Sequence, residues 1–186
     1  MMQNKVRISK FLSLVLRHRP EEIGLTLESD GWVKVADLLD ACARHNFPLT
    51  AETLVDVVRT NDKQRFAFSD DQLMIRANQG HSVKVDLQLD PLLPPQILYH
   101  GTASRFLPQI RAQGLTKGQR HHVHLSENTK TVVEVGSRYG RPVVLKIASG
   151  RMNEDGHLFF RSANGVWLTE HVPVNYIEFP NKEVDR

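Results

Sequence analysis

The spacing of apolar residues changes half-way along this chain, and that change restricts the possible folds more than any other feature of the sequence. In most of the first 76 residues, apolar side chains recur every three or four positions, which is the period of a helix that buries one face. From residue 96 onwards they recur in short alternating runs, which is the period of β-strands. The stretch between loses both periods and ends in the extended pair Pro94-Pro95. The sequence therefore predicts an α+β protein with two lobes, 1–76 and 96–186, and a linker over 77–95.

The first lobe is predicted to contain three helices followed by a hairpin. The expected elements are helices over 6–16, 35–44 and 51–60, a short strand at 31–33, and hairpin strands at 66–68 and 73–75. Thr50 is the expected N-cap of the third helix. Three helices and a two-stranded hairpin form the pattern of a winged-helix lobe.

The second lobe is predicted to contain many short strands and two helices. The expected strands are 97–100, 122–125, 143–147, 159–161, 166–168 and 176–179. One helix is expected over 107–113, with Pro108 in its first turn and Gly114 just after its end, and the other from its cap Ser126 to about residue 139. In the linker, residues 83–89 alternate and are compatible with an edge strand.

Composition excludes several classes of protein. The apolar runs are far shorter than the roughly 20 residues of a membrane span, and the N-terminus lacks the apolar core of a signal peptide, so we expect a cytoplasmic protein without a membrane partner. A monomer is the default expectation, on which the sequence is silent. Cys42 is the one cysteine, which excludes an internal disulfide and a cysteine zinc site, and its helical pattern places it in the core. The net charge is only +3, so RNA binding would depend on a few placed cations.

Arg17 and His18 end the first predicted helix, and Pro20 stops it. Cations at this place have a purely structural explanation, because they interact favourably with the helix dipole. They also have a functional one, in which Arg17 binds a phosphate through two parallel hydrogen bonds and His18 transfers a proton.

Lys63 and Arg65 are two cations at a spacing of two residues, where the first strand of the hairpin is predicted to begin. Side chains at this spacing share one face of a strand and repel each other unless an anion lies between them. The alternative is a solvated hairpin edge that its cations keep soluble.

The segment Tyr99-His100-Gly101-Thr102 is interpreted as a strand that ends in a glycine turn. Such a turn leaves backbone N–H groups near an imidazole and a hydroxyl, and it can hold a ribose or a phosphate. A structural histidine explains the same residues equally well.

Arg120 precedes the strand that carries His122 and His124, which share one strand face. Arg120 is a candidate clamp for a phosphate or pyrophosphate. The two histidines are a conceivable metal pair, but no third ligand is evident and we expect no metal.

Taken together, these segments resemble the NAD⁺-dependent RNA 2′-phosphotransferase family, and the match covers nearly the whole chain. The motifs are SKFLSLVLRHRP at 9–20, DGWV at 30–33, KQRF at 63–66, GHS at 80–82, LYHGT at 98–102, RHHVHLS at 120–126 and NGVWLT at 164–169. Each motif alone is weak evidence. All of them in order and at compatible spacing are highly specific, and no key position departs from the pattern.

The resemblance implies a winged-helix first lobe and a second lobe with the ADP-ribosyltransferase fold. The family's catalytic Arg-His-Arg-Arg tetrad maps onto Arg17, His18, Arg65 and Arg120. The residues expected to bind the substrate phosphate are Arg17, Lys63 and Arg65, and those expected to bind NAD⁺ as co-substrate are His100, Gly101, Thr102 and Arg120. The chain has no Gly-x-Gly-x-x-Gly, so a Rossmann unit for NAD⁺ is not supported.

The reaction that the resemblance implies has two steps and fits these residues. An internal RNA 2′-phosphate first attacks the nicotinamide-bearing ribose, and the ribose 2″-hydroxyl then attacks that phosphate, giving 2′-OH RNA and ADP-ribose 1″,2″-cyclic phosphate. The first step needs alignment of two anions, which we assign mainly to Arg120. The second needs proton transfer by His18, with Arg17 and Arg65 stabilising charge on the phosphate.

Two other functions stay open at this stage. An ADP-ribosyltransferase acting on the terminal phosphates of nucleic acids would use the same tetrad, whereas members that modify side chains rely on a Glu-x-Glu pair, which is absent here. A winged-helix regulator would bind DNA through a basic third helix. That helix carries Glu52 and Asp56 against Arg59, which argues against DNA binding.

Overall fold

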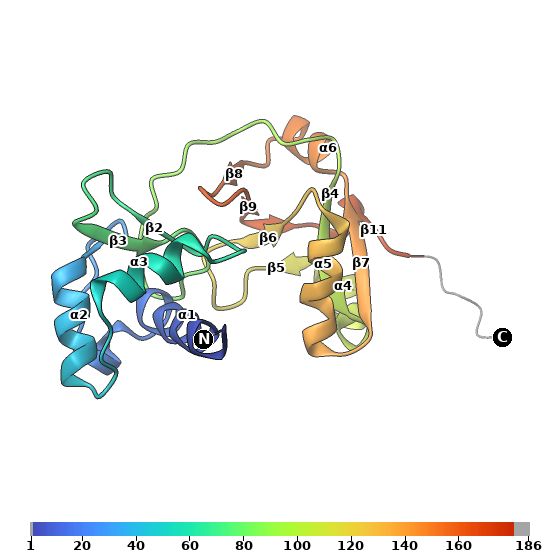
Figure 1. The fold of residues 1–186 in the computed structure, drawn as a ribbon. Coiled ribbons are helices and arrows are strands. Elements are labelled where there is room, and N and C mark those ends of the chain that lie inside the picture. Colours follow the sequence, from blue (N-terminus) through green and yellow to red (C-terminus); the bar gives the residue numbers. More distant parts are fainter. Residues whose placement is uncertain (1, 181–186) are drawn as a thin grey trace. The chain divides into compact units, whose positions relative to one another are not determined.

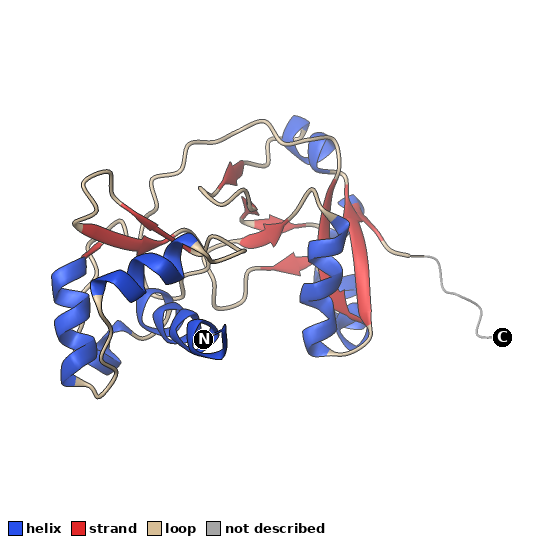
Figure 2. Cartoon of the chain, viewed as in Figure 1, coloured by secondary structure: helices blue, strands red, loops and turns tan. Residues whose placement is uncertain are grey.

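The computed structural model describes residues 2–180 and divides the chain into two compact units, one ending at Leu89 and the other beginning at Asp90. Figure 1 traces the chain from α1 to β11, and Figure 2 shows helices and strands in both units. The predicted α+β class is confirmed. The boundary between the units lies inside the predicted linker.

The first unit begins with helices and ends with a sheet. Its elements are α1 (Met2–Arg17), the 3₁₀ helix η1 (Pro20–Ile23), β1 (Val33–Lys34), α2 (Val35–Arg44), α3 (Ala51–Arg59), β2 (Phe66–Phe68) and β3 (Met74–Ala77). The predicted cap is confirmed, because the Thr50 hydroxyl accepts a hydrogen bond of 3.2 Å from the backbone N–H of Thr53.

An antiparallel sheet in the order β1-β3-β2 closes this unit. In β3, Ile75 pairs with Val33 on one side and with Phe68 on the other. Two predictions at its edges are wrong. Ala77 belongs to β3 and not to the linker, and Arg65 precedes β2 because Gln64 has the left-handed φ of 40°, which interrupts an extended strand.

The three helices and the sheet of this unit enclose one apolar core. Its fully buried members come from both, for example Leu12, Leu38, Leu54 and Ile75. Cys42 is buried in the same core, as predicted, and burial raises the pKa of its thiol to about 11. Its role is packing.

The second unit contains short strands connected by short helices. The strands are β4 (Leu98–Ala103), β5 (Leu115–Thr116), β6 (Val123–Leu125), β7 (Pro142–Ile147), β8 (Phe159–Arg161), β9 (Trp167–Thr169), β10 (His171–Val172) and β11 (Ile177–Glu178). The helices are η2 (Ser104–Phe106), α4 (Leu107–Gln113), α5 (Thr129–Gly136), η3 (Ser137–Tyr139), α6 (Ser149–Glu154) and η4 (Val174–Tyr176). Pro108 and Gly114 lie at the ends of α4 as predicted. The short α6 was not predicted.

Two three-stranded antiparallel sheets carry the site of this unit, in the orders β11-β7-β4 and β6-β9-β8. An isolated antiparallel bridge joins them, in which Tyr99 and Ser126 exchange backbone hydrogen bonds of 2.8 and 2.9 Å. The bridge brings the end of β6 next to the start of β4. The buried core beneath includes Leu98, Leu145 and Phe159.

Gly101 is an internal residue of β4, and the predicted glycine turn is wrong. The strand pairs with β7 along its whole length, from Leu98 to Ala103. An added Cβ at Gly101 would lie 1.8 Å from the carbonyl oxygen of Val132 in α5, and one at Gly136 would lie 2.4 Å from the carbonyl oxygen of Thr102. Glycine is needed here because α5 packs backbone to backbone against β4 (Figure 1).

Asn128, and not the predicted Ser126, caps α5. Its side-chain oxygen accepts hydrogen bonds from the N–H groups of Lys130 and Thr131, at 2.8 and 3.4 Å. Ser126 instead accepts a bond of 3.0 Å from the N–H of Asn128, so it orders the turn before the helix. The helix is also shorter than predicted, because residues 137–139 are a 3₁₀ turn.

The linker contains no strand at residues 83–89, which leaves the edge strand considered for that segment unformed. The backbone N–H of Asp86 donates instead to the carbonyl of Ser29, at 2.7 Å. Among the residues described, no helix combines the length and apolarity that crossing a membrane requires.

Candidate active site

The C-terminal end of α1 places two of the predicted site residues side by side. Arg17 is the last helical residue, and the N–H groups of His18 and Arg19 both donate to the carbonyl of Leu14, at 2.9 Å. The chain then turns into η1 at Pro20. Arg17 is half-buried, and His18, the first residue after the helix, is exposed.

Arg65 is held against α1 by a small polar network. Its guanidinium donates to the Asn61 side-chain oxygen at 3.2 Å and to the Ser9 hydroxyl at 3.5 Å. The Asn61 side chain also donates to Ser9, at 2.9 Å, and its oxygen accepts from the backbone N–H of Lys63, at 3.2 Å. Asn61 therefore fixes the loop that carries both predicted cations. The prediction that Lys63 and Arg65 share one face of a strand is wrong, because both lie in a loop that is not extended.

The side chain of Arg17 reaches the same loop. Its guanidinium donates to the Arg65 carbonyl, at 3.1 Å, and lies over the Phe66 ring, 5.8 Å from the ring centroid. Asn78 supports the loop from β3, because its backbone N–H donates to Arg65 and its side chain to Gln64, at 2.9 and 2.6 Å. The fold thus brings together Arg17, His18 and Arg65, although 48 residues separate Arg17 from Arg65.

In the second unit, the geometry of His100 specifies its tautomer. Its Nδ1 lies 2.9 Å from the backbone carbonyl of His124, and because a carbonyl can only accept, Nδ1 carries the proton. The other ring nitrogen is then the acceptor in the neutral form. Burial lowers the pKa of His100, the hydrogen bond to the carbonyl of His124 opposes this, and the charge of Arg120 lowers it further.

The side chain of His124 contacts Arg120. The Arg120 guanidinium donates to Nδ1 of His124, four residues further along the chain, at 3.2 Å. His124 therefore connects two predicted NAD⁺-binding residues, because its carbonyl orients the ring of His100 and its ring holds Arg120. Arg120 itself is exposed. Its cation is available to an anionic ligand such as a pyrophosphate.

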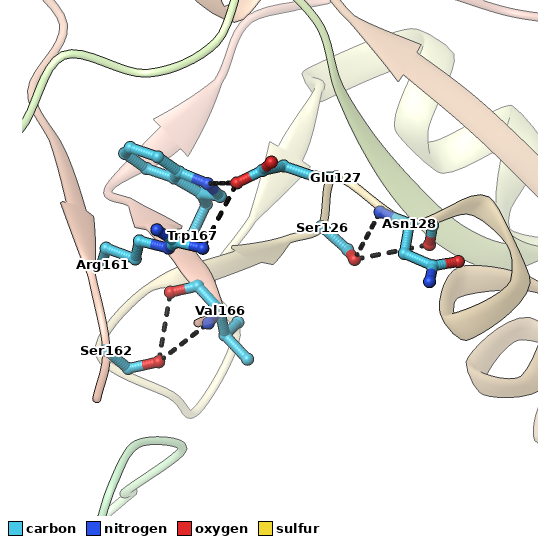
Figure 3. Close-up of polar contacts among 7 residues, drawn as sticks. All are labelled: Ser126, Glu127, Asn128, Arg161, Ser162, Val166 and Trp167. Carbon is cyan, nitrogen blue, oxygen red and sulfur yellow. Dashed lines mark hydrogen bonds and ion pairs between the residues drawn. The ribbon is translucent and has the colours of Figure 1, made fainter. Parts of the chain in front are cut away.

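A further polar cluster lies where α5 begins (Figure 3). The indole N–H of Trp167 donates to the Glu127 carboxylate at 2.7 Å, and the Arg161 guanidinium lies 3.5 Å from the same carboxylate oxygen. The next residue, Asn128, is the cap of α5. These contacts join β9 and β8 to the turn between β6 and α5, which positions the helix that packs on Gly101.

Comparison with known proteins gives a match over most of the chain. The family model for "RNA 2′-phosphotransferase, Tpt1 / KptA family" matches residues 3–171. The chain belongs to this family. The RNA 2′-phosphotransferase fold thus provides the setting for both groups of residues described above.

Curated relatives of this phosphotransferase are about equally similar. Proteins described as "Probable RNA 2′-phosphotransferase" are 52% identical in Acaryochloris marina, over 95% of this chain and 97% of the relative. The relative from Streptomyces coelicolor is 53% identical, over 96% of this chain and 97% of its own length. That from Rhodopirellula baltica is also 53% identical, over 94% and 96%.

The phosphotransferase fold places the remaining predicted residues as follows. Thr102 is buried, with 6% of its surface exposed, and the space beside Gly101 is filled by the backbone of α5. His122 packs against Phe160, with ring centroids 5.5 Å apart. Within residues 2–180, no group of three or more His, Cys, Asp or Glu side chains is arranged to hold a metal.

Several supporting residues of the phosphotransferase site were missed at the sequence level. They are Ser9, Asn61, Asn78, Ser82 and the side chain of His124. All but Asn61 and Asn78 lie inside the motifs that carry the family resemblance, so that resemblance was a usable signal. Asn61 and Asn78 gave no signal, because small polar residues in loops have many roles.

Proposed function

We propose that this phosphotransferase removes an internal RNA 2′-phosphate by transferring it to NAD⁺. The observation that carries the proposal is the contact of the Arg17 guanidinium with the Arg65 backbone, directly beside His18. This contact places two cations that suit a phosphate, Arg17 and Arg65, next to His18, which suits proton transfer, and all three lie in the first unit. Family membership makes an RNA 2′-phosphate the natural anion.

The two units correspond, in this proposal, to a winged-helix lobe and an ADP-ribosyltransferase-like lobe. The first is supported by three helices followed by the β2–β3 hairpin, with β1 as the third strand of the sheet. The second is supported by two short antiparallel sheets, with α5 packed on the strand that carries His100. The predicted lobes, 1–76 and 96–186, lie within these two units, and β3 extends the first lobe to Ala77.

The residues of the second unit fit a dinucleotide co-substrate. In its neutral form, the His100 ring presents an acceptor nitrogen, which suits a ribose hydroxyl. Arg120 is an exposed guanidinium, which suits a pyrophosphate. Gly101 acts indirectly, because its missing side chain lets α5 pack on the strand that carries His100.

In the first step, a 2′-phosphate oxygen of the RNA forms a bond to the ribose C1″ of NAD⁺. The bond from C1″ to the pyridinium nitrogen breaks, and its electron pair leaves with neutral nicotinamide. The product is RNA whose 2′-phosphate carries ADP-ribose. The nucleophile is already anionic, so this step needs charge neutralisation and alignment, which we assign mainly to Arg120.

In the second step, the ribose 2″-oxygen forms a bond to phosphorus, and the bond from phosphorus to the RNA 2′-oxygen breaks. His18 takes the proton of the 2″-hydroxyl and delivers a proton to the departing 2′-oxygen. Arg17 and Arg65 stabilise the charge on the phosphate oxygens, and Lys63 adds charge from the same loop. The products are 2′-OH RNA and ADP-ribose 1″,2″-cyclic phosphate, without a step that calls on a metal.

The experiment is one incubation of the purified chain with NAD⁺, chelator and a short RNA that carries one internal 2′-phosphate. We expect loss of the phosphate together with formation of ADP-ribose 1″,2″-cyclic phosphate. A second incubation contains an RNA with a terminal phosphate instead. If the RNA with the internal 2′-phosphate stays intact while NAD⁺ is consumed with the terminal-phosphate RNA, the proposal is overturned in favour of a terminal-phosphate ADP-ribosyltransferase. If NAD⁺ stays unreacted with both RNAs, NAD⁺ is not the co-substrate of this chain.

A further inference from the structure

Residues 80–83 cover the C-terminal end of α1. The backbone N–H groups of Ser82 and Val83 both donate to the carbonyl of Arg17, at 2.8 and 3.2 Å. The last carbonyls of a helix have no partners within the helix, so these two bonds satisfy a group that would otherwise need water. They also place Ser82 next to the ring of His18.

The backbone on each side of Ser82 is anchored within the first unit. His81 is 1% exposed, and its Nε2 lies 3.5 Å from the position that a Cβ would occupy on Gly31. Further along, Asp86 donates to the carbonyl of Ser29, at 2.7 Å. Ser82 is therefore an exposed side chain on a backbone that is held in place.

The Ser82 hydroxyl bridges two groups of the α1 terminus. Its oxygen lies 2.9 Å from Nδ1 of His18 and 3.5 Å from the backbone carbonyl of Arg17. A hydroxyl has one proton to donate, and a carbonyl can only accept. When Ser82 donates to the carbonyl, its oxygen must accept from His18, which requires the proton on Nδ1.

We propose that Ser82 is a positioning residue for the second step of the reaction. It holds His18 in the tautomer with the proton on Nδ1, and it directs Nε2 toward the reacting oxygens. This inference rests on the proposed function. It adds Ser82 to the residues that the second step depends on.

The direction of this hydrogen bond fits a histidine that acts first as base and then as acid. His18 in its charged form donates from both ring nitrogens, and in the Nδ1–H tautomer it still donates from Nδ1. Ser82 can accept that bond in both states. A bond in which Ser82 donates to Nδ1 would break each time the ring gained a proton. The arrangement thus keeps the ring orientation constant through the step.

The test is Ser82→Ala in the full chain, studied in single turnover with NAD⁺ and RNA that carries one internal 2′-phosphate. Both backbone bonds to Arg17 persist in this variant. We expect the second step to slow roughly tenfold, which is the effect of one orienting hydrogen bond, with accumulation of ADP-ribosylated RNA and an unchanged first step. Ser82→Thr, which keeps the hydroxyl, should restore the second step to within about threefold.

A second measurement does not depend on turnover. Nitrogen NMR of the His18 ring should show the Nδ1–H tautomer in the wild-type chain and a mixture in Ser82→Ala. The control is Ser137→Ala, an exposed serine in η3 whose hydroxyl donates to the carbonyl of Glu134 at 2.9 Å. It should leave both steps and the ring tautomer unchanged.

Each result has one meaning. A wild-type chain without NAD⁺-dependent turnover overturns the proposed function. If the wild-type chain turns over and Ser82→Ala equals it in the second step and in the His18 tautomer, the inference about Ser82 is wrong. Equal slowing of both steps, unrescued by threonine, would also overturn it, because that is the result of a general loss of structure.

Discussion

At the residue scale, neighbours in sequence have different partners and different tasks. Arg17 turns inward and donates to the backbone of Arg65, whereas His18 stays exposed and contacts Ser82. The same division occurs in the second unit, where the carbonyl of His124 orients His100 and its ring holds Arg120. His18, His100 and Arg120 are therefore each held by a residue to which no chemical role is assigned, whereas Arg17 is held by the backbone of Arg65.

His18→Ala should separate the two steps of the reaction. We expect ADP-ribosylated RNA to accumulate, because the first step needs no base while the second loses general acid–base help, which is typically worth about 10²–10⁴-fold. Quenched time courses analysed by mass spectrometry of the RNA give both rates. The matched control is His45→Ala, an exposed histidine after α2, which should behave as wild type. RNA and NAD⁺ left wholly unreacted by His18→Ala would show that the assigned role is incorrect.

Arg120→Ala should give the opposite pattern. It removes the exposed guanidinium that we assign to the alignment of phosphate and pyrophosphate. We therefore expect the first step to slow by at least about 10²-fold, and ADP-ribosylated RNA should not accumulate. Formation of nicotinamide in single turnover measures this step directly. Arg111→Ala, an exposed arginine in α4, is the control. Accumulation of ADP-ribosylated RNA in the Arg120 variant would move this residue to the second step.

At the element scale, the site of the second unit depends on how closely α5 approaches β4. Gly101 and Gly136 allow backbone to meet backbone, and Asn128 begins the helix at the end of the turn that follows β6. In the first unit, Arg65 lies on a loop. Asn61 holds the segment before β2 against Ser9 of α1, and Asn78, just after β3, donates to its backbone.

Gly101→Ala should strongly destabilise the chain. A Cβ 1.8 Å from a carbonyl oxygen of α5 requires the helix to move, and we expect a loss of about 3 kcal/mol in the free energy of unfolding. Urea denaturation followed by circular dichroism measures it. Gly118→Ala is the matched control, with a φ of 58° but no atom within 4 Å of the added Cβ, and should cost about 1 kcal/mol. Equal losses in the two variants would contradict the close-packing argument.

At the scale of the whole molecule, the proposed reactive residues are divided between two units that each have their own core. The first unit contributes Arg17, His18 and Arg65, and the second contributes His100 and Arg120. The proposed phosphate-binding residues and the proposed NAD⁺-binding residues therefore belong to different units.

The stability of the chain should decrease as the pH falls below about 6.5. Burial lowers the pKa of both His100 and His122 from their usual value of 6.5, so in this range the unfolded chain binds protons that the folded chain does not. The stability that the two neutral histidines contribute is complete above pH 6.5. It is lost as the pH falls through their lowered pKa values in the folded chain. Comparing urea denaturation at about pH 7.5 and 5.5 measures this.

His100→Gln provides the check on that assignment. It should reduce the loss of stability between the two pH values, whereas His45→Gln, at an exposed position, should not. An unchanged pH dependence in His100→Gln would show that other groups are responsible.

The sequence by itself determined the α+β class, the buried Cys42, the Thr50 cap and the family, because periodicity, capping and motif order are local or collinear properties. Tertiary structure alone decided what Gly101 does. Its neighbours in sequence suit a turn, but a helix carbonyl about thirty residues further on occupies the space of its missing side chain. The partner of His18 was equally invisible, since Ser82 reaches it only after a loop 64 residues away has folded against the end of α1. The same holds for the loop of Arg65, which is placed by the contact of Asn61 with Ser9 of α1.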